Sequence, residues 1–270
     1  MKLRTRYWSD LTSEEFSRLD RERLIAVLPV GATEQHGPHL PMSTDTATID
    51  AMVRACLPYL PGELPVLFLP TVPYGKSNEH SRYPGTLTVS ASTLIALWME
   101  IGACVARAGV RKLVLYNSHG GQMAPMDIVA RDLREAHGMM VVAANWYTLG
   151  LPQGMFTEEE GRHGIHAGDL ESSIMMHVTP DDVRHDQLRN FHSMTQDLAA
   201  ENRFLSITPS GKLGWQMHDI NPWGAAGDAS RATAEKGAAV LDHVGRRFVQ
   251  LLQEVDRFPL ARLGNEPAWR

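Results

Sequence analysis

The sequence has 270 residues, of which 43% are hydrophobic and 21% are charged, a composition typical of a globular protein that buries a sizeable core. A formal net charge of −5, with no stripe of lysines and arginines, argues against nucleic acid as a partner. No segment approaches the roughly 20 apolar residues that span a bilayer, and the N-terminus lacks the apolar core of a signal peptide. The two cysteines form no disulfide framework, so we expect a cytoplasmic protein without a membrane partner.

Apolar runs and amphipathic segments alternate along the first half of the chain. Residues 24–30 and 66–72 are compact apolar runs that end in polar loops, so both are predicted to be buried strands. Residues 92–108 carry apolar side chains three and four apart, which predicts an amphipathic helix that ends at Gly109. Residues 112–116 predict a third buried strand.

The same alternation continues in the second half. Residues 123–137 are predicted to be helical, 139–144 to form a fourth strand, and 167–178 to form another helix. A final helix is predicted from about residue 229 to residue 255. The Gly-rich stretch 209–228 has no clear period and is too long for a passive connector, so we expect it to border the functional site or a subunit contact.

This order of elements predicts the fold class. Strands that alternate with helices favour an α/β fold with a mainly parallel sheet, because each parallel return needs a crossover, and helices would cover both faces. No internal repeat and no Ser/Pro-rich linker divides the sequence. Residues 1–270 are therefore predicted to form a single domain with its core at about residues 20–255.

Two of the predicted strands end in strongly polar loops, GATEQHGPHLPMSTD after the first and NSHGGQ after the third. Ligands of open parallel sheets bind beyond the carboxyl ends of the strands. Glu34 and His36 are two residues apart, so on an extended segment they project to the same side. Asp45 follows a Pro-containing loop that can fold back, and His119 arrives from the other strand end.

Two carboxylates and two imidazoles form a ligand set suited to Zn²⁺, Mn²⁺ or Fe²⁺. A carboxylate such as Asp45 can bridge two metal ions roughly 3.5–4 Å apart. An isolated glutamate or histidine in a loop is more often a surface residue. Here Glu-x-His lies in a loop of small residues, Asp45 follows nine residues later, and His119 precedes Gly120 and Gly121, which let backbone and ligand approach closely. The joint pattern favours a metal site.

The segments LPVGATEQHGPHLPMSTD, NEHSRYPGT, NSHGGQ and HAGDLESS resemble those of the creatininase (creatinine amidohydrolase) family, and GAAGDASRATAEKG resembles the C-terminal Gly-Asp segment of that family. The resemblance runs in order from about residue 24 to residue 240. It implies an α/β fold with a parallel sheet, a centre with two divalent metal ions per subunit, and a homo-oligomer, often a hexamer. It also implies hydrolysis of a C–N bond in a small cyclic amide or formamide.

The resemblance also carries functional residues over to this sequence. Four positions match the metal ligands of the family: Glu34, His36, Asp45 and His119. Glu171 matches an acidic position that completes the second metal site in many members, which would place it among the catalytic residues; the alternative is a residue that only lies near a helix start. His166 matches a histidine that the family uses in substrate contact or proton transfer, a role that suits a neutral imidazole near pH 7.

Three further positions are predicted to contact the substrate, namely His80, Gly120 and Gly121, and the alternative for His80 is that it holds its own loop in place. Two departures from creatininase itself are present. Gly121 stands where that enzyme has an acidic ligand, so a second metal ion would be either held by Glu171 or held weakly. The segment EEEGRHGIH before His166 also lacks the tryptophan that packs over the substrate ring, so creatinine is not the expected substrate.

The predicted function is that of a metal-dependent amidohydrolase with a small-molecule substrate. A metal-activated hydroxide would attack an amide-type carbonyl, and His166 or a metal-linked carboxylate would protonate the leaving nitrogen. The sequence contains no G-x-S-x-G, P-loop or G-x-G-x-x-G motif that would indicate another chemistry. Two alternatives stay open: a metal-dependent hydrolase of a lactone, a sugar-derived ring or a peptide-derived cofactor precursor, and a non-catalytic metal-binding scaffold.

Overall fold

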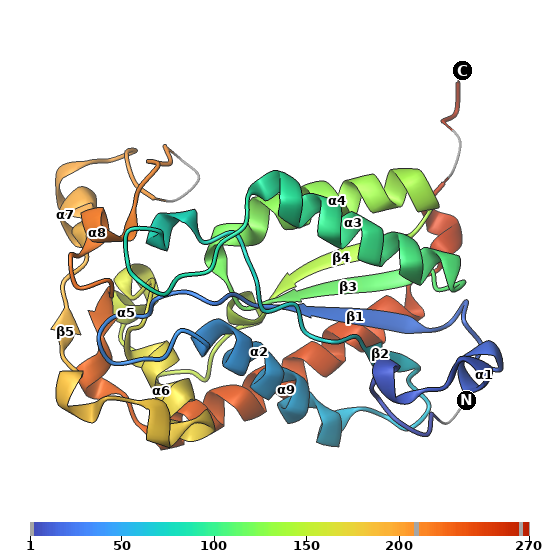
Figure 1. The fold of residues 1–270 in the computed structure, drawn as a ribbon, viewed down its shortest axis with the longest axis horizontal. Coiled ribbons are helices and arrows are strands. Elements are labelled where there is room, and N and C mark those ends of the chain that lie inside the picture. The colour runs from blue at the N-terminus through green and yellow to red at the C-terminus, as the bar shows by residue number, and fades with distance from the viewer. Residues whose placement is uncertain (1–2, 208–210, 265–266, 270) are drawn as a thin grey trace.

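In residues 3–207, 211–264 and 267–269, which the computed structural model describes, four parallel strands form the central sheet in the order β2-β1-β3-β4 (Figure 1). The strands are β1 (Ile25–Val30), β2 (Val66–Phe68), β3 (Lys112–Asn117) and β4 (Met140–Asn145). After β1 the chain first adds β2 on one side and then β3 on the other. Such a switch in strand order opens a crevice at the carboxyl ends of the two central strands, where ligands of open α/β sheets bind.

Four helices cover the sheet, α2 and α9 on one face and α3 and α4 on the other (Figure 1). Their bounds are α2 (Thr44–Cys56), α3 (Ala91–Arg107), α4 (Met123–His137) and α9 (Ala234–Arg257). Side chains alternate across β1, so Val27 packs with Ile49 of α2 while Leu28 packs with Trp98 of α3. The predicted α/β fold, with a parallel sheet covered on both faces, is confirmed.

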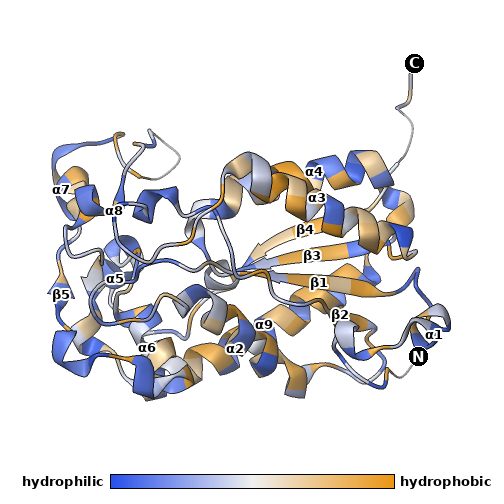
Figure 2. Cartoon of the chain, in the orientation of Figure 1, coloured by the Kyte–Doolittle hydropathy of each residue, from blue (hydrophilic) through white to orange (hydrophobic). Residues whose placement is uncertain are grey.

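Every residue of β1, β2 and β3 is buried, as expected of strands covered on both faces. Figure 2 shows these strands as hydrophobic along most of their length, whereas the layer beyond their carboxyl ends is more hydrophilic. That layer contains the remaining short elements α5 (Glu158–His163), α6 (Asp169–Val178), α7 (Met194–Glu201), α8 (Met217–Ile220), β5 (Asn190–Phe191) and β6 (Gly227–Asp228). Helix α1 (Ser13–Ser17) lies at the opposite end of the sheet (Figure 1).

Several element boundaries differ from the predictions. Strand β2 ends at Phe68 rather than at residue 72, because Pro70 has no N–H with which to continue the ladder. Helix α9 begins at Ala234 rather than at about residue 229, and the hydroxyl of its N-cap residue Thr233 accepts a hydrogen bond from the amide of Lys236.

Helix α2 was not among the predicted elements. Its apolar residues Ile49, Met52, Val53 and Cys56 are spaced as i, i+3, i+4 and i+7, which is the signature of a helix face, so the signal was present in the sequence. Because of this helix, Asp45 lies in a regular first turn instead of in a loop.

The predicted Gly-rich stretch 209–228 is described only from residue 211 on, since residues 208–210 lie outside the described part of the chain. It contains α8 and β6, and β6 pairs antiparallel with β5. In the described ranges, no helix is both long and apolar enough to cross a membrane.

Candidate metal centre

The sequence-predicted acids and histidines converge at the carboxyl ends of β1 and β3. Glu34 and His36 follow β1, and His119 follows β3. Asp45 lies in the first turn of α2, and Glu171 lies in the first turn of α6. The backbone around these residues is tied together, since the Ser118 hydroxyl donates to the Asp45 carbonyl at 2.7 Å and the His119 amide donates to the Asn117 side chain at 2.9 Å.

The ligand atoms form three overlapping groups, and within each group they lie within 4.8 Å of one another. The first set is Glu34, Asp45 and His119; the second set is His36, Asp45 and Glu171; the third group is Glu34, His36 and His166. Asp45 joins the first two sets, with Oδ2 at 3.4 Å from His119 Nδ1 and Oδ1 at 3.6 Å from His36 Nε2. Its two oxygens therefore face different imidazoles, as expected of a carboxylate that bridges two cations.

Three of these ligand atoms are buried and, within the described residues, have no hydrogen-bond partner: Glu34 Oε2, His36 Nε2 and Asp45 Oδ2. Their side chains are at most 4% exposed. Unpaired polar atoms at such burial are rare and costly unless something compensates them. Because each of these atoms belongs to a residue of the ligand groups, a divalent cation fits the donor set.

Backbone carbonyls determine which nitrogen of three histidines carries the proton, since a carbonyl can only accept. His36 Nδ1 donates to the Glu34 carbonyl at 3.1 Å, and His119 Nε2 donates to the Lys76 carbonyl at 2.9 Å. His166 Nε2 donates to the Gln35 carbonyl at 2.8 Å. In each ring the other nitrogen faces the carboxylates, which is the arrangement found in metal-binding histidines.

The pKa shifts of the site residues indicate a centre that stabilises positive charge. Burial alone would lower the pKa of His36, but the carboxylates of Asp45 and Glu171 raise it to about 9. Burial also opposes protonation of His119, yet the charge of Glu34 holds its pKa well above the usual range. Burial raises the pKa of Glu171 to about 7. Without a cation, the centre therefore holds extra protons in its place.

Comparison with known proteins identifies the family. The family model named Creatininase, described as creatinine amidohydrolase, matches residues 9–252. The chain belongs to the creatininase family. A mycofactocin precursor peptide peptidase of Mycobacterium tuberculosis is 33% identical over 259 residues, which cover 92% of this chain and 93% of the relative. The creatinine amidohydrolase of Pseudomonas putida is 30% identical over 255 residues, which cover 86% of this chain and 90% of the relative.

A solved structure of creatinine amidohydrolase (creatininase) matches the fold with a TM-score of 0.75 at 23% sequence identity, covering 95% of this chain and 100% of that one. The family resemblance stated from the motifs is thereby confirmed. This chain is accordingly a hydrolase of the creatininase family.

In this creatininase-family chain, a strained segment positions Glu171. Ala167 has a φ of 53°, a left-handed conformation that residues with a side chain rarely adopt. Its amide donates to Glu171 Oε2 at 2.5 Å, and its carbonyl accepts a hydrogen bond from His39 Nε2 at 3.0 Å. Backbone strain of this kind persists where surrounding contacts enforce it, frequently at functional sites.

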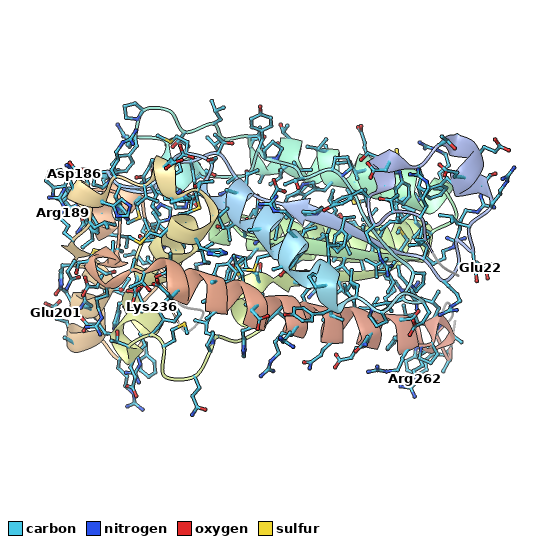
Figure 3. The ribbon with its side chains drawn as sticks, turned by 90° about the horizontal axis from the view of Figure 1, so that it is seen from below. Glu22, Asp186, Arg189, Glu201, Lys236 and Arg262 are labelled. Atoms are coloured by element: carbon cyan, nitrogen blue, oxygen red, sulfur yellow. The ribbon has the colours of Figure 1, made fainter. Side chains whose placement is uncertain are left out.

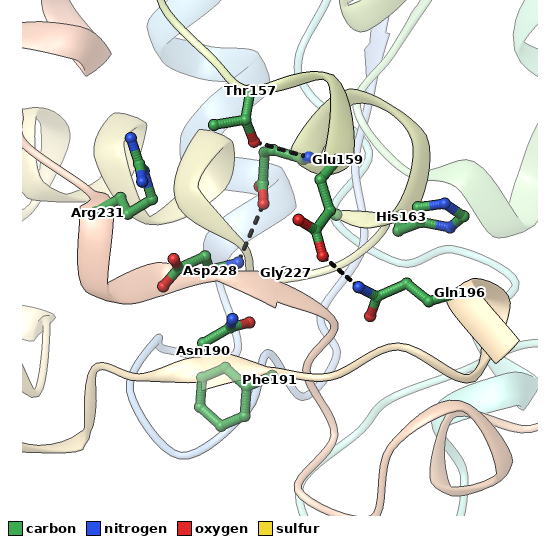
Figure 4. A pocket seen from close by; sticks show the side chains of 11 residues that line it. Thr157, Glu159, His163, Asn190, Phe191, Gln196, Gly227, Asp228 and Arg231 are labelled. Carbon is green, nitrogen blue, oxygen red and sulfur yellow. Dashed lines mark hydrogen bonds between the residues drawn. The ribbon is translucent and has the colours of Figure 1, made fainter.

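Buried Glu160 lines a pocket between α5 and the β5–β6 pair, which Figure 4 shows from close by, and its carboxylate connects α6 to β6. Its carboxylate accepts hydrogen bonds from the amides of Leu170 at 3.2 Å and Asp228 at 3.0 Å. Three glycines leave room for this carboxylate: Gly164, Gly168 and Gly227. The start of α6 is also tied to α9, because Lys236 Nζ lies 2.6 Å from Asp169 Oδ2 at the end of α9 nearest this layer (Figure 3).

The three predicted substrate contacts have different surroundings. His80 lies in the 3₁₀ helix Asn78–His80, with Nε2 at 3.3 Å from Glu34 Oε1. A Cβ on Gly120 would meet nothing within 4 Å, so this residue faces open space. A Cβ on Gly121 would overlap the Glu79 carboxylate and lie 2.6 Å from His119 Nε2. Gly121 thus accommodates Glu79, and the role of all three residues in substrate binding stays a prediction.

The sequence reasoning missed three residues beside the centre. Gln35 lies between the paired ligands of the first loop, Glu79 lies next to His80, and Tyr147 follows the end of β4. The Tyr147 hydroxyl is buried without a hydrogen-bond partner in the described ranges, and burial, with the charges of Asp45 and Glu171, raises its pKa. Only its place after a strand end could have singled it out.

Proposed function

We propose that this chain is a metal-dependent amidohydrolase that cleaves a C–N bond of a small cyclic amide or formamide. The observation that carries the proposal is the convergence of unpaired, buried ligand atoms from Glu34, His36 and Asp45 at the carboxyl ends of β1 and β3. No purely structural role accounts for three unpaired polar atoms at such burial.

The residues divide between two cation positions. The first set of Glu34, Asp45 and His119 would hold one ion, and the second set of His36, Asp45 and Glu171 would hold the other. When bound, divalent cations supply a Lewis acid that activates water and polarises a carbonyl. The donor types suit zinc, manganese or iron, and two solved creatininase structures that share the fold are described as a manganese form and a Zn–Zn form.

His166 is the side chain that we propose moves the proton. Its Nε2–H is committed to the Gln35 carbonyl, so Nδ1, 4.0 Å from Glu34 Oε1, has the free lone pair. Burial and the nearby His36 keep the pKa of His166 well below the usual range, so the ring is neutral at pH 7. His166 Nδ1 would accept a proton from the attacking water and return it to the leaving nitrogen.

The predicted substrate contacts belong to the same proposal. Gly120 faces open space and would let a flat substrate approach the backbone, while His80 and Gly121 would border the site. We also propose a homo-oligomer, as the family resemblance implies, which light scattering on the purified protein would test.

A second candidate substrate is a peptide-derived cofactor precursor. The relatives at 33% identity that span over 90% of both chains are named mycofactocin precursor peptide peptidases. A 3-dehydro-scyllo-inosose hydrolase of Thermotoga maritima, 23% identical over 289 residues, represents the sugar-ring alternative. Attack of water on a carbonyl is common to all these reactions, so the candidate metal centre does not separate them.

The experiment is a substrate panel on protein loaded with Zn²⁺ or Mn²⁺, comprising cyclic amides, formamides, lactones and short peptides. We expect turnover of an amide, loss of turnover on chelation, and its recovery on adding metal. Hydrolysis of lactones or peptides alone would assign the activity to an alternative substrate class. Turnover that survives complete metal removal, or no turnover of any compound by metal-loaded protein, would contradict the proposal.

A further inference from the structure

Four imidazoles meet in the described part of the candidate metal centre, and His80 differs from the other three. His36, His119 and His166 each donate to a backbone carbonyl through one ring nitrogen and turn the other ring nitrogen towards the carboxylates. His80 instead pairs through Nδ1 with a side chain, the Gln35 amide, at 2.7 Å. Its ring packs beside that of His166, with centroids 4.4 Å apart, so it belongs to the same cluster.

The orientation of the Gln35 amide is determined by its surroundings. The backbone amide of Gly37 donates to Gln35 Oε1 at 2.9 Å, so the nitrogen Nε2 must be the atom that faces His80. Gln35 is 3% exposed, and a Cβ on Gly224 would overlap Oε1, so the loop before β6 closes directly over the amide. The amide is therefore confined in one orientation.

It follows which nitrogen of His80 carries the proton. An amide nitrogen can only donate, so His80 Nδ1 must accept and the proton resides on Nε2. That Nε2–H points at Glu34 Oε1, 3.3 Å away.

We propose that Gln35 is a positioning residue that holds His80 as an Nε2–H donor to Glu34 Oε1. The donor orients the Glu34 carboxylate, so that the unpaired Oε2 is left for a cation, and it keeps the His80 ring out of the ligand set. Reversing the tautomer would turn a lone pair of His80 against a buried carboxylate. The inference deepens the proposed function and rests on the metal centre proposed there.

The first test is solid-state ¹⁵N NMR of protein labelled at histidine, with the His80 signals assigned from their loss in His80→Gln. We expect unprotonated Nδ1 and protonated Nε2 in wild type, both metal-free and zinc-loaded. In Gln35→Glu the carboxylate only accepts, so Nδ1 should become protonated. A wild-type His80 protonated on Nδ1 or coordinated to zinc, or an unchanged pattern in Gln35→Glu, would overturn the proposal.

The second test is the affinity for Zn²⁺, measured by competition with a chelator. Gln35→Glu and the uncharged Gln35→Met should both weaken binding by about 10–100-fold, as loss of a supporting contact to a ligand does. Gln196→Met is the control, because the Gln196 amide donates to Glu159 and its oxygen accepts from the Ser193 backbone amide, so it contacts no histidine or ligand of the centre. Equal weakening in the control and in Gln35→Met would contradict a specific role.

The two tests separate this inference from the function on which it rests. If wild-type protein binds no zinc, the proposed function fails, while the tautomer of His80 in metal-free protein still decides the role of Gln35. If zinc binds and hydrolysis occurs but His80 has the other tautomer, the inference fails alone.

Discussion

The two sets of the candidate metal centre share Asp45 but are built differently. In the first set, Glu34 and His119 extend from the ends of central strands, and their side chains are 1% and 4% exposed. In the second set, Glu171 is 20% exposed and belongs to a ten-residue helix that begins next to a strained alanine. The two sets thus differ in the element that supplies one ligand, since the first takes His119 from a strand end and the second takes Glu171 from the start of α6.

We expect this difference to give the two sets different affinities for their cations. A ligand set on rigid strand ends is organised before the cation arrives, so less is lost on binding. In the second set Glu171 is more exposed and therefore less confined by its surroundings. We therefore expect the first set to bind its cation more tightly than the second.

The largest effect should follow substitution of the shared residue. Asp45→Asn removes the charge that both sets use, so metal content should fall to near zero, and turnover should fall about 10³-fold or more. Elemental analysis and kinetics measure both. Asp50→Asn is the control on the same helix, since Asp50 accepts a hydrogen bond from Thr71 instead of joining a ligand set. An Asp45→Asn variant that keeps one tightly bound ion would mean that the sets are independent.

Glu171→Gln should change the second set and leave the first set intact. It removes the charge of the second set alone, so the metal content should fall by one equivalent and turnover by about 10²-fold. Glu235→Gln, at the exposed first turn of α9, serves as the control. Unchanged metal content would assign Glu171 to the helix start only.

A change beside the first set should weaken it without touching a ligand. In Gly121→Ala the new Cβ would overlap Glu79 and lie 2.6 Å from His119 Nε2, so the ring must move. We expect zinc affinity to fall about 10–100-fold and the free energy of unfolding to fall by about 1–3 kcal/mol. Gly120→Ala is the matched control for affinity and stability, because its Cβ enters open space. Equal effects in the two variants would remove the argument that Gly121 accommodates Glu79.

The metal-free protein should lose stability as pH rises from 7 to 9. The pKa of His36 is raised to about 9 in the folded state, against an ordinary value of 6.5, so its stabilising contribution is complete below pH 6.5 and is lost through pH 9. Chemical denaturation should show a loss of about 2 kcal/mol over this interval. The slope should be smaller in His36→Ala and in metal-loaded protein, and the part that remains in His36→Ala should come from His119 and Glu171, whose pKa values are also raised. A rise in stability over the same interval would contradict the assigned charges.

The smallest effect is expected at the strained turn. Ala167→Gly relieves the left-handed conformation but increases the freedom of the unfolded chain, so the free energy of unfolding should change by no more than about 1 kcal/mol. Dissociation of the ion at the second set should become faster, because Glu171 is held less firmly. Thermal unfolding and stopped-flow chelation measure the two quantities. Slower dissociation of this ion would show that the left-handed conformation of Ala167 does not hold Glu171 in place.

Much of the fold was predictable, because its signals are local. Buried strands such as β1 and β3 appear as continuous apolar runs. Because these strands are parallel, the polar loops that follow them lie at the same edge of the sheet. Glu34, His36 and His119 could therefore be expected to meet. Helix α2 was also predictable from the helical spacing of apolar residues such as Ile49 and Met52, although it was not among the predicted elements.

The residues that were missed depend on contacts far along the chain. Gln35 is confined only because Gly224 lies over its amide, and Glu79 fits only because residue 121 has no side chain. The residue types at these positions do not by themselves reveal the contacts between them. Likewise, the role of Glu171 depends on the conformation of Ala167, which no local propensity favours.

Anomalous diffraction from crystals of zinc-loaded protein, collected on both sides of the zinc absorption edge, tests the central claim most directly. The account predicts two peaks per chain, one bonded to Glu34, Asp45 and His119 and a weaker one bonded to His36, Asp45 and Glu171. Peaks elsewhere in the molecule, a single peak without Asp45 as a ligand, or zinc bonded to His80, would contradict it.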